Sequence, residues 1–441
     1  QLAYTDYEFG RILDYLERIG ELDNTLVLFT SDNGASGEGG LHGTFNENGF
    51  FNGVSNMPNE FNNQYINEWG NRVGVWHVTA GWTMAGNTPF KYYKQSAHRG
   101  GNADPLVISW PAGIPEQFHG QIRSQYSHII DIAPTILEAT GVEAPKVIDG
   151  HEQMPFDGIA LNYTFENPDA PSKRTVQYYE LFGNRAIYAD GWTAVTLHRN
   201  KRPWVLTAEG TLDDDVWELY NLAEDFSQST DVAAQYPEKL EELKALFDRE
   251  DQANNVYPLD GDLAPRFAAM QSIAAPQDKE LVFHPPAAIR VHESASPPLK
   301  NKSHEFIAEM NAGGDGMLVT AGGRTSGYAL FVKNGRLTYV YNFLGMERTM
   351  LTSDRTIPAG DSVLSMKFTK TGNFEGDVEL FIDGESVGKT HLDKTISSTY
   401  SIEETFDVGE DTGSPIIEDV YAVPFRNEAL QKLTVRVGEP N

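Results

Sequence analysis

The stretch NTLVLFTSDNG, residues 24–34, joins a short apolar run to a polar turn. The apolar run, residues 25–30, is typical of a strand that is buried on both faces of a parallel sheet. Asp32 and Asn33 follow it directly. Because ligands in open α/β sheets bind where strands end, this turn is a candidate binding site.

The segments around this stretch indicate an α/β region. Apolar residues at helical spacing predict a helix over residues 5–20, and a second apolar run at residues 105–110 predicts another strand. A further helix is predicted over residues 127–139. We therefore expect residues 1–150 to form part of an α/β domain with a parallel sheet.

The last of these helices carries end signals. Ser127 is the expected N-cap and Gly141 lies just past the end. We expect Asp131 to hold local structure, and we interpret His42 and His128 as ordinary polar residues rather than as ligands.

Two smaller parts follow. Residues 151–265 combine predicted strands at 178–181 and 192–197 with a helix over 237–249, which indicates a small α+β subdomain. Residues 266–300 are rich in Ala and Pro and are expected to form a linker or an extended wrap.

The C-terminal region, residues 301–441, has the pattern of short strands with tight turns. Asn334-Gly335 lies between two apolar runs, which is a strong signal for a β-hairpin. Asp383-Gly384 repeats the pattern after another apolar run. We expect a β-sandwich or a jelly-roll here.

The composition excludes several classes of protein. Asp and Glu number 63 against 34 Lys and Arg, for a formal net charge of -29, which argues against nucleic-acid binding. No apolar run reaches the roughly 18 residues that a membrane span needs. The chain has no Cys, so a disulfide or a thiolate site is excluded; this fits the cytoplasm, the periplasm and secretion equally and leaves the compartment open.

Residues 89–101 gather basic side chains in this acidic chain, namely Lys91, Lys94, His98 and Arg99. A Lys over sulfate oxygens stabilises the charge that builds up in the transition state, and a His near the ester oxygen can protonate the leaving group. The alternative is a solvated basic loop.

The turn at Asp32 and Asn33 offers hard oxygen ligands of the kind that Ca²⁺ or Mg²⁺ prefers. The alternative is an ordinary Asn-Gly turn. Other ligands would have to come from elsewhere, because Ca²⁺ takes roughly six to eight.

The loop of residues 34–88 is long and rich in Gly, Asn and aromatic residues. Long loops in compact domains are often functional. Trp69, Trp76, His77 and Trp82 are candidate walls of an aromatic-ester pocket, with Trp76 and His77 as substrate contacts. The alternative, slightly favoured, is packing that pins the loop down.

Several segments resemble, in the same order, the sulfatase family of the alkaline phosphatase superfamily, including its long bacterial arylsulfatases. They are the strand and metal-binding turn at 24–34, the lysine and paired-glycine segment at 94–101, a helix at 131–138, a strand at 217–222 and the tail at 404–413. The resemblance implies that Asp32 and Asn33 are two ligands of a Ca²⁺ ion, with Mg²⁺ as the alternative. It also implies that Lys94 touches the sulfate or the ester oxygen, and it places His98 in the same catalytic segment.

The family's nucleophile is formylglycine, which is made from Cys or Ser in a C/S-x-P-S-R motif. No Cys and no Ser-x-Pro-Ser-Arg string is present; the nearest string, residues 296–300, is interpreted as chance. The family's remaining acidic metal ligands also lie upstream of the matching segments. We therefore expect this chain to be the C-terminal portion of such an enzyme. It should be inactive alone and should be completed by an upstream segment or a separate chain.

The leading hypothesis is a sulfuric ester hydrolase that acts on small-molecule or carbohydrate sulfate esters. A phosphonate or phosphate monoester hydrolase of the same superfamily is the second. The third is a non-catalytic carbohydrate-binding protein or pseudo-enzyme, and the fourth is an incomplete product with no function alone.

Overall fold

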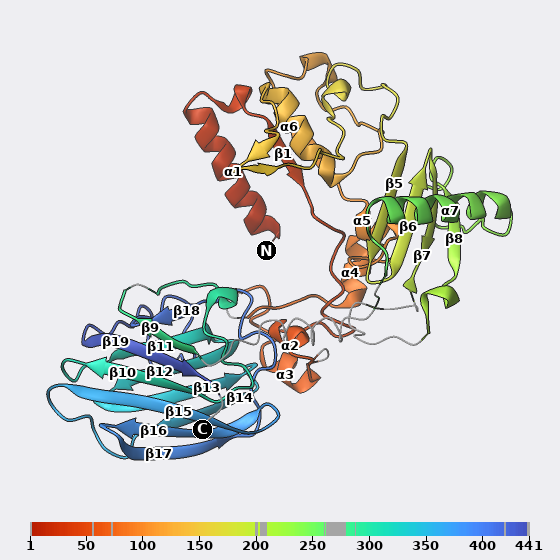
Figure 1. Ribbon diagram of the computed structural model, residues 1–441. Helices are drawn as coiled ribbons and strands as arrows, with labels where there is room; N and C mark the ends of the chain where they lie inside the picture. The colour runs from red at the N-terminus through yellow and green to blue at the C-terminus, as the bar shows by residue number, and fades with distance from the viewer. Residues whose placement is uncertain are drawn as a thin grey trace. The chain divides into compact units, whose positions relative to one another are not determined.

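The computed structural model divides the chain into two compact units, which we describe separately (Figure 1). The first unit comprises residues 1–37 and 82–263, and the second comprises residues 38–81 and 264–441. Most of the long Gly-rich loop therefore groups with the C-terminal strands. The structure describes residues 2–54, 57–71, 74–198, 202, 210–259, 261, 279–286, 288–418 and 420–438.

The first unit begins with the predicted helix α1 (Leu2–Arg18) and strand β1 (Val27–Thr30). Strand β2 (Leu106–Ser109) pairs with β1 in antiparallel direction, so the predicted parallel arrangement is wrong for this pair. Burial on both faces is also wrong, because Phe29 is 45% exposed and Val107 is 59% exposed. An apolar run predicts the presence of a strand. The direction of the strand that pairs with it is set by tertiary structure.

Helix α6 (Ile132–Thr140) ends as predicted at Gly141, whose φ of 68° gives the left-handed cap. Its start differs from the prediction. His128, and not Ser127, caps the short helical turn that leads into α6, because its ring accepts a backbone amide while Asp131 accepts the amide of His128. An imidazole nitrogen serves here as the acceptor that a hydroxyl was expected to supply. The structural role predicted for Asp131 is confirmed.

The subdomain that follows contains an antiparallel sheet in the order β5-β6-β7-β8, covered by α7. Leu243 and Phe247 of α7 pack on Ile187 of β6 and Leu219 of β8. The sequence predicted β5 and β7 as neighbours and missed β6, whose buried Asn184 hides the apolar pattern. The bounds are β5 (Val176–Leu181), β6 (Asn184–Ala189), β7 (Trp192–Thr196), β8 (Trp217–Asn221) and α7 (Pro237–Ala253).

Short elements complete the chain up to residue 152. They are α2 (Asn48–Phe51), α3 (Asn59–Gln64), α4 (Ala80–Gly86), α5 (Arg99–Asn102), β3 (Val147–Ile148) and β4 (His151–Glu152). Among the residues that the structure describes, no helix combines the length and the apolar character needed to cross a membrane.

Two antiparallel sheets dominate the second unit. Phe306 and Met366 of one sheet and Leu330 and Tyr339 of the other belong to one buried core, so the sheets form a sandwich. The first sheet runs β17-β16-β15-β10-β19-β9 and the second β14-β13-β12-β11-β18. The bounds are β9 (Lys279–Phe283), β10 (His304–Met310), β11 (Gly316–Gly323), β12 (Ser326–Lys333), β13 (Arg336–Phe343), β14 (Glu347–Thr352), β15 (Ser362–Gly372), β16 (Glu375–Ile382), β17 (Glu385–Leu392), β18 (Phe406–Val408) and β19 (Leu430–Val437).

Both predicted hairpins are present in this sandwich. Asn334 and Gly335 have φ values of 52° and 69°, and Asp383 and Gly384 have values of 51° and 80°, as tight hairpin turns require. The predicted linker is only partly described, since residues 262–278 lie outside the described residues. Its described part contains β9, which pairs with β19 and so belongs to the sheet.

Asparagine side chains attach the loop of residues 38–81 to the sandwich. The Asn46 amide donates to the carbonyls of Thr325 at 2.7 Å and Leu344 at 2.8 Å. Asn52 accepts the amide of Ser398 at 2.8 Å. An amide side chain can donate and accept at once, so the Asn-rich composition satisfies backbone groups that this contact buries.

Candidate active site

The polar turn after β1 lies beside the basic segment of residues 89–101. The amide of Gly34 donates to the carbonyl of Gly101 at 3.2 Å, and the amide of Lys94 donates to the carbonyl of Ala35 at 3.0 Å. The structure thus brings together two segments that the sequence singled out independently.

Glycines make this close approach feasible. A Cβ added to Gly34 would lie 1.8 Å from the carbonyl oxygen of Gly100, and one added to Gly101 would lie 2.1 Å from that of Ser96. Both distances are far below contact, so only glycine fits. These glycines thus allow two segments of the backbone to approach each other closely.

Asn87, which the sequence analysis missed, holds the two segments in register. Its side-chain oxygen accepts the amide of Ala35 at 3.0 Å, while its NH₂ group donates to the carbonyls of Tyr92 at 2.9 Å and Gly100 at 2.6 Å. Nothing in the sequence distinguishes this residue from the other asparagines, because its contact with Ala35, 52 residues away, depends on the fold.

The backbone on either side of Lys94 is strained. Tyr92 has a φ of 65° and Gln95 a φ of 76°, in the left-handed region that non-glycine residues rarely adopt. Each such residue costs about 1–3 kcal/mol, and strain of this kind gathers at functional sites.

The residues at the turn fit a hard divalent cation. Asp32 is exposed and Asn33 is partly buried, and Asp104 lies near them. The pKa of Asp104 is raised, first by burial and then by the negative charge of Asp32. Two neighbouring carboxylates and an amide oxygen make a donor set of the type that Ca²⁺ or Mg²⁺ takes.

Asp104 escaped the sequence analysis for a physical reason. In the antiparallel pair, Leu106 at the start of β2 lies opposite Thr30 at the end of β1. A residue just before β2 therefore lies beside the turn that follows β1. The predicted parallel arrangement would have placed Asp104 at the opposite end of the sheet.

His98 is fully buried and forms a polar network with Glu218 of β8. Its Nε2 lies 3.1 Å from Oε2 of Glu218, and the Lys91 Nζ lies 2.9 Å from the same oxygen. Tyr220 also donates its hydroxyl to that carboxylate. The network links the basic segment to the sheet of the subdomain. No sequence pattern assigned a role to Glu218.

The protonation of this network follows from its contacts. Burial lowers the pKa of His98. Burial would raise the pKa of Glu218, but hydrogen bonds from His98, Tyr220 and Lys91 outweigh it and lower that pKa to about 2. Glu218 is therefore ionised near neutral pH and acts as the acceptor at the centre of the network.

Comparison with known proteins now assigns the family. A model of the family described as Sulfatase matches residues 1–142. Residues 1–142 are therefore a sulfatase-family segment of this chain. That match contains the turn, Asn87, Lys94, His98 and Asp104.

Several curated sulfatases match more of the chain. An uncharacterized sulfatase of Schizosaccharomyces pombe is 29% identical over 246 residues, which cover 54% of this chain and 40% of that protein. An arylsulfatase of Klebsiella aerogenes is 27% identical over 36% of this chain and 32% of its own length. An N-acetylglucosamine-6-O-sulfatase of Bacteroides thetaiotaomicron is 26% identical over 55% of this chain and 33% of its own. The chain thus spans at most 40% of the length of these relatives.

Trp76 and His77, the predicted substrate contacts, lie in the second unit. Trp69 and Trp76 pack against the sandwich core with ring centroids 6.4 Å apart, which favours the packing interpretation for both. Trp82 belongs to the first unit and is 73% exposed. The substrate-binding role of Trp76 and His77 stays a prediction.

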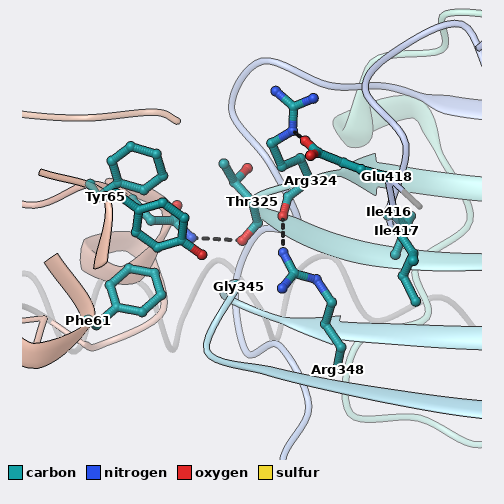
Figure 2. A pocket seen from close by; sticks show the side chains of 11 residues that line it. Phe61, Tyr65, Arg324, Thr325, Gly345, Arg348, Ile416, Ile417 and Glu418 are labelled. Atoms are coloured by element: carbon teal, nitrogen blue, oxygen red, sulfur yellow. Dashed lines mark hydrogen bonds and ion pairs between the residues drawn. The ribbon is translucent and has the colours of Figure 1, made fainter. Parts of the chain in front are cut away.

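A cavity of about 360 Å³ opens in the second unit, with aromatic side chains on one side and arginines on the other (Figure 2). Phe45 and Tyr65 stack with ring centroids 4.0 Å apart. Arg324 pairs with Glu418, and the Arg348 guanidinium donates to the Arg324 carbonyl at 3.0 Å. This combination of aromatic faces and cations suits a sugar that carries a negative charge.

Proposed function

We propose that this chain supplies part of an active site that hydrolyses aryl or carbohydrate sulfate esters to an alcohol or phenol and sulfate. One observation carries the proposal: the Gly34–Gly101 hydrogen bond sets the turn of Asp32 and Asn33 beside the strained segment of Lys94. The match of residues 1–142 to the sulfatase family supports it.

In this proposal Asp32, Asn33 and Asp104 help to hold a Ca²⁺ ion, with Mg²⁺ as the alternative. Such an ion, when bound, supplies positive charge beside the sulfate oxygens. Lys94 adds a second positive charge and stabilises the oxygen on which negative charge develops. A locally cationic site is needed because the chain as a whole repels anions.

His98 was predicted to protonate the leaving group, and that role stays a prediction. Its complete burial and its bond to Glu218 support a positioning role instead. In that role His98 anchors the segment that carries Lys94 to strand β8.

The residues of this chain do not fit formylglycine. The sequence has no Cys and no Ser-x-Pro-Ser-Arg string from which formylglycine could be made. We infer that an upstream segment or a separate chain supplies the nucleophile and further acidic metal ligands. The 441-residue chain alone should then not hydrolyse sulfate esters.

The test compares the 441-residue chain with the same chain extended through its native upstream sequence. Hydrolysis of 4-nitrophenyl sulfate and of 4-nitrophenyl phosphate is measured with Ca²⁺ present. We expect only the extended chain to hydrolyse these substrates. It should hydrolyse 4-nitrophenyl sulfate faster than 4-nitrophenyl phosphate. Turnover by the short chain would contradict the inferred missing nucleophile, and a preference for phosphate would favour the phosphonate or phosphate monoester hydrolase.

The cavity at Tyr65 supports a second function, non-catalytic carbohydrate binding. Tyr65, which stacks on the buried Phe45, offers an aromatic ring for a sugar, and Arg348 offers a charge for its sulfate. Calorimetric titration with a sulfated glycan and its desulfated form tests this. We expect Tyr65→Ala to weaken binding of the sulfated form and Tyr4→Ala, on exposed α1, to leave it unchanged. If the wild type and both variants bound the sulfated glycan equally, the cavity would be excluded as its binding site.

A further inference from the structure

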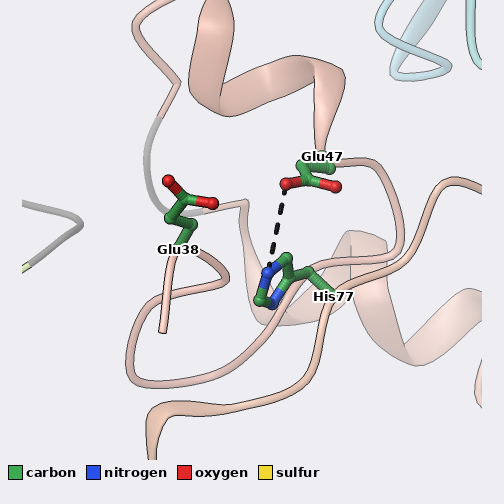
Figure 3. Close-up of side chains that lie close together, drawn as sticks. All are labelled: Glu38, Glu47 and His77. Carbon is green, nitrogen blue, oxygen red and sulfur yellow. Dashed lines mark ion pairs between the residues drawn. The ribbon is translucent and has the colours of Figure 1, made fainter. Parts of the chain in front are cut away.

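Glu38, Glu47 and His77, all in the second unit, converge on one another (Figure 3). One ligand atom from each lies within 4.8 Å of the others. We propose that these side chains bind a divalent first-row transition ion, with Zn²⁺ as the best match. The proposal does not depend on sulfatase activity.

Backbone hydrogen bonds fix two of the ligands. The amide of His77 donates to the carbonyl of Thr44 at 2.7 Å, and the amide of Thr44 donates back at 3.0 Å. The amide of Glu47 donates to the carbonyl of Val75 at 2.6 Å. The two loop segments that carry Glu47 and His77 are therefore held side by side, as a preorganised site requires.

The third ligand is placed by the same loop. The amide of Ala80 donates to the carbonyl of Gly40 at 2.8 Å, which brings the segment of Glu38 next to that of His77. Gly39 lies between them in space: a Cβ there would be 2.5 Å from the carbonyl oxygen of Val78 and 2.9 Å from Nδ1 of His77. Only glycine leaves the imidazole in this position.

The tautomer of His77 suits a metal ligand. Its Nδ1 lies 3.3 Å from the carbonyl oxygen of Val78. A carbonyl only accepts, so Nδ1 carries the proton and Nε2 presents a lone pair. Metal-binding histidines commonly donate their other ring N–H to a backbone carbonyl in this way.

The geometry between the ligands matches one shared ion. Nε2 of His77 lies 4.0 Å from Oε1 of Glu47, which is too long for a hydrogen bond. Ligands that each lie about 2.0–2.2 Å from one Zn²⁺ are roughly 3–4 Å apart. An ion between these two atoms could accept a lone pair from Nε2 and one from Oε1 at once.

Burial and donor type narrow the choice of ion. Glu38 is 8% exposed, and the side chains of His77 and Glu47 are 11% and 18% exposed. Imidazole with carboxylates suits Zn²⁺ and its neighbours, whereas Ca²⁺ favours oxygen ligands alone.

Calorimetric titration of the chelator-treated full chain with ZnCl₂ tests the proposal, and Co²⁺ serves as the spectroscopic probe. We expect His77→Gln, Glu47→Gln and Glu38→Gln to lower Zn²⁺ affinity by about 10–100-fold or more. The visible absorption of bound Co²⁺ should fall with them. Circular dichroism establishes that each variant is folded, and the three variants together guard against one that is not.

Matched controls come from the same loop. His42→Gln and Glu60→Gln replace exposed residues of the same types outside the cluster and should leave Zn²⁺ affinity unchanged. Wild-type chain that binds no Zn²⁺, or folded cluster variants that bind it as tightly as the wild type, would overturn the proposal. Displacement of Zn²⁺ by equimolar Ca²⁺ would overturn the assignment of the ion.

Discussion

The amide of Gly34 donates to the carbonyl of Gly101, and this bond joins the candidate metal turn to the segment of Lys94. Gly34→Ala would force a Cβ to 1.8 Å from the Gly100 carbonyl oxygen, a backbone atom that cannot rotate away. We predict that this substitution lowers the free energy of unfolding by about 1–3 kcal/mol. Urea denaturation measures it.

Gly10→Ala is the matched control for that substitution. Gly10 lies inside α1, and a Cβ there meets nothing within 4 Å. Since Ala favours a helix over Gly by up to about 1 kcal/mol, this variant should be as stable as the wild type or more stable. Equal effects of the two substitutions would show that the contact at Gly34 is unimportant.

Glu218 should make the first unit sensitive to acid. Its pKa of about 2 lies below the ordinary value of 4.5, so its stabilising contribution is complete above about pH 4.5 and is lost as the pH falls towards 2. We predict that Glu218→Gln lowers stability near neutral pH and flattens the loss between pH 4.5 and 2. Urea denaturation at a series of pH values measures both effects.

The control for this pH dependence is Glu166→Gln, at an exposed position of the same unit. It should leave the acid profile as it is in the wild type. If Glu218→Gln and wild type lost stability in parallel over that range, Glu218 would not be the ionised acceptor of the network.

Asn52 should be important for attaching the loop to the sandwich. Its side chain accepts the amide of Ser398 and donates to the carbonyl of Thr399, each at 2.8 Å. Asn52→Ala leaves these partly buried groups unsatisfied, so we predict a loss of about 1–3 kcal/mol. Thermal unfolding measures it, with Asn63→Ala on the exposed face of α3 as the neutral control. Two equally neutral variants would contradict the prediction.

Local signals allowed much of the fold to be predicted. The hairpin at Asn334-Gly335 could be predicted because the turn needs left-handed backbone at both positions, which depends on those residues alone. Gly141 was predicted as a helix stop for the same reason. Such features depend on a few neighbouring residues.

Features that depend on distant partners could not be predicted. The direction of the β1–β2 pair is set by tertiary structure, and with it the place of Asp104 beside Asp32. Asn87 and Glu218 have partners far away in the chain, so no sequence pattern distinguished them. The residues that hold the candidate site together were therefore the ones missed.

The most direct test of the account is the effect of Lys94→Ala on 4-nitrophenyl sulfate hydrolysis by the chain extended through its native upstream sequence. We predict a loss of about 100-fold or more in kcat, because the positive charge beside the reacting sulfate is removed. Lys146→Ala, at an exposed position of the same unit, should keep full activity. Unchanged turnover by Lys94→Ala would contradict the assignment of this segment to the active site.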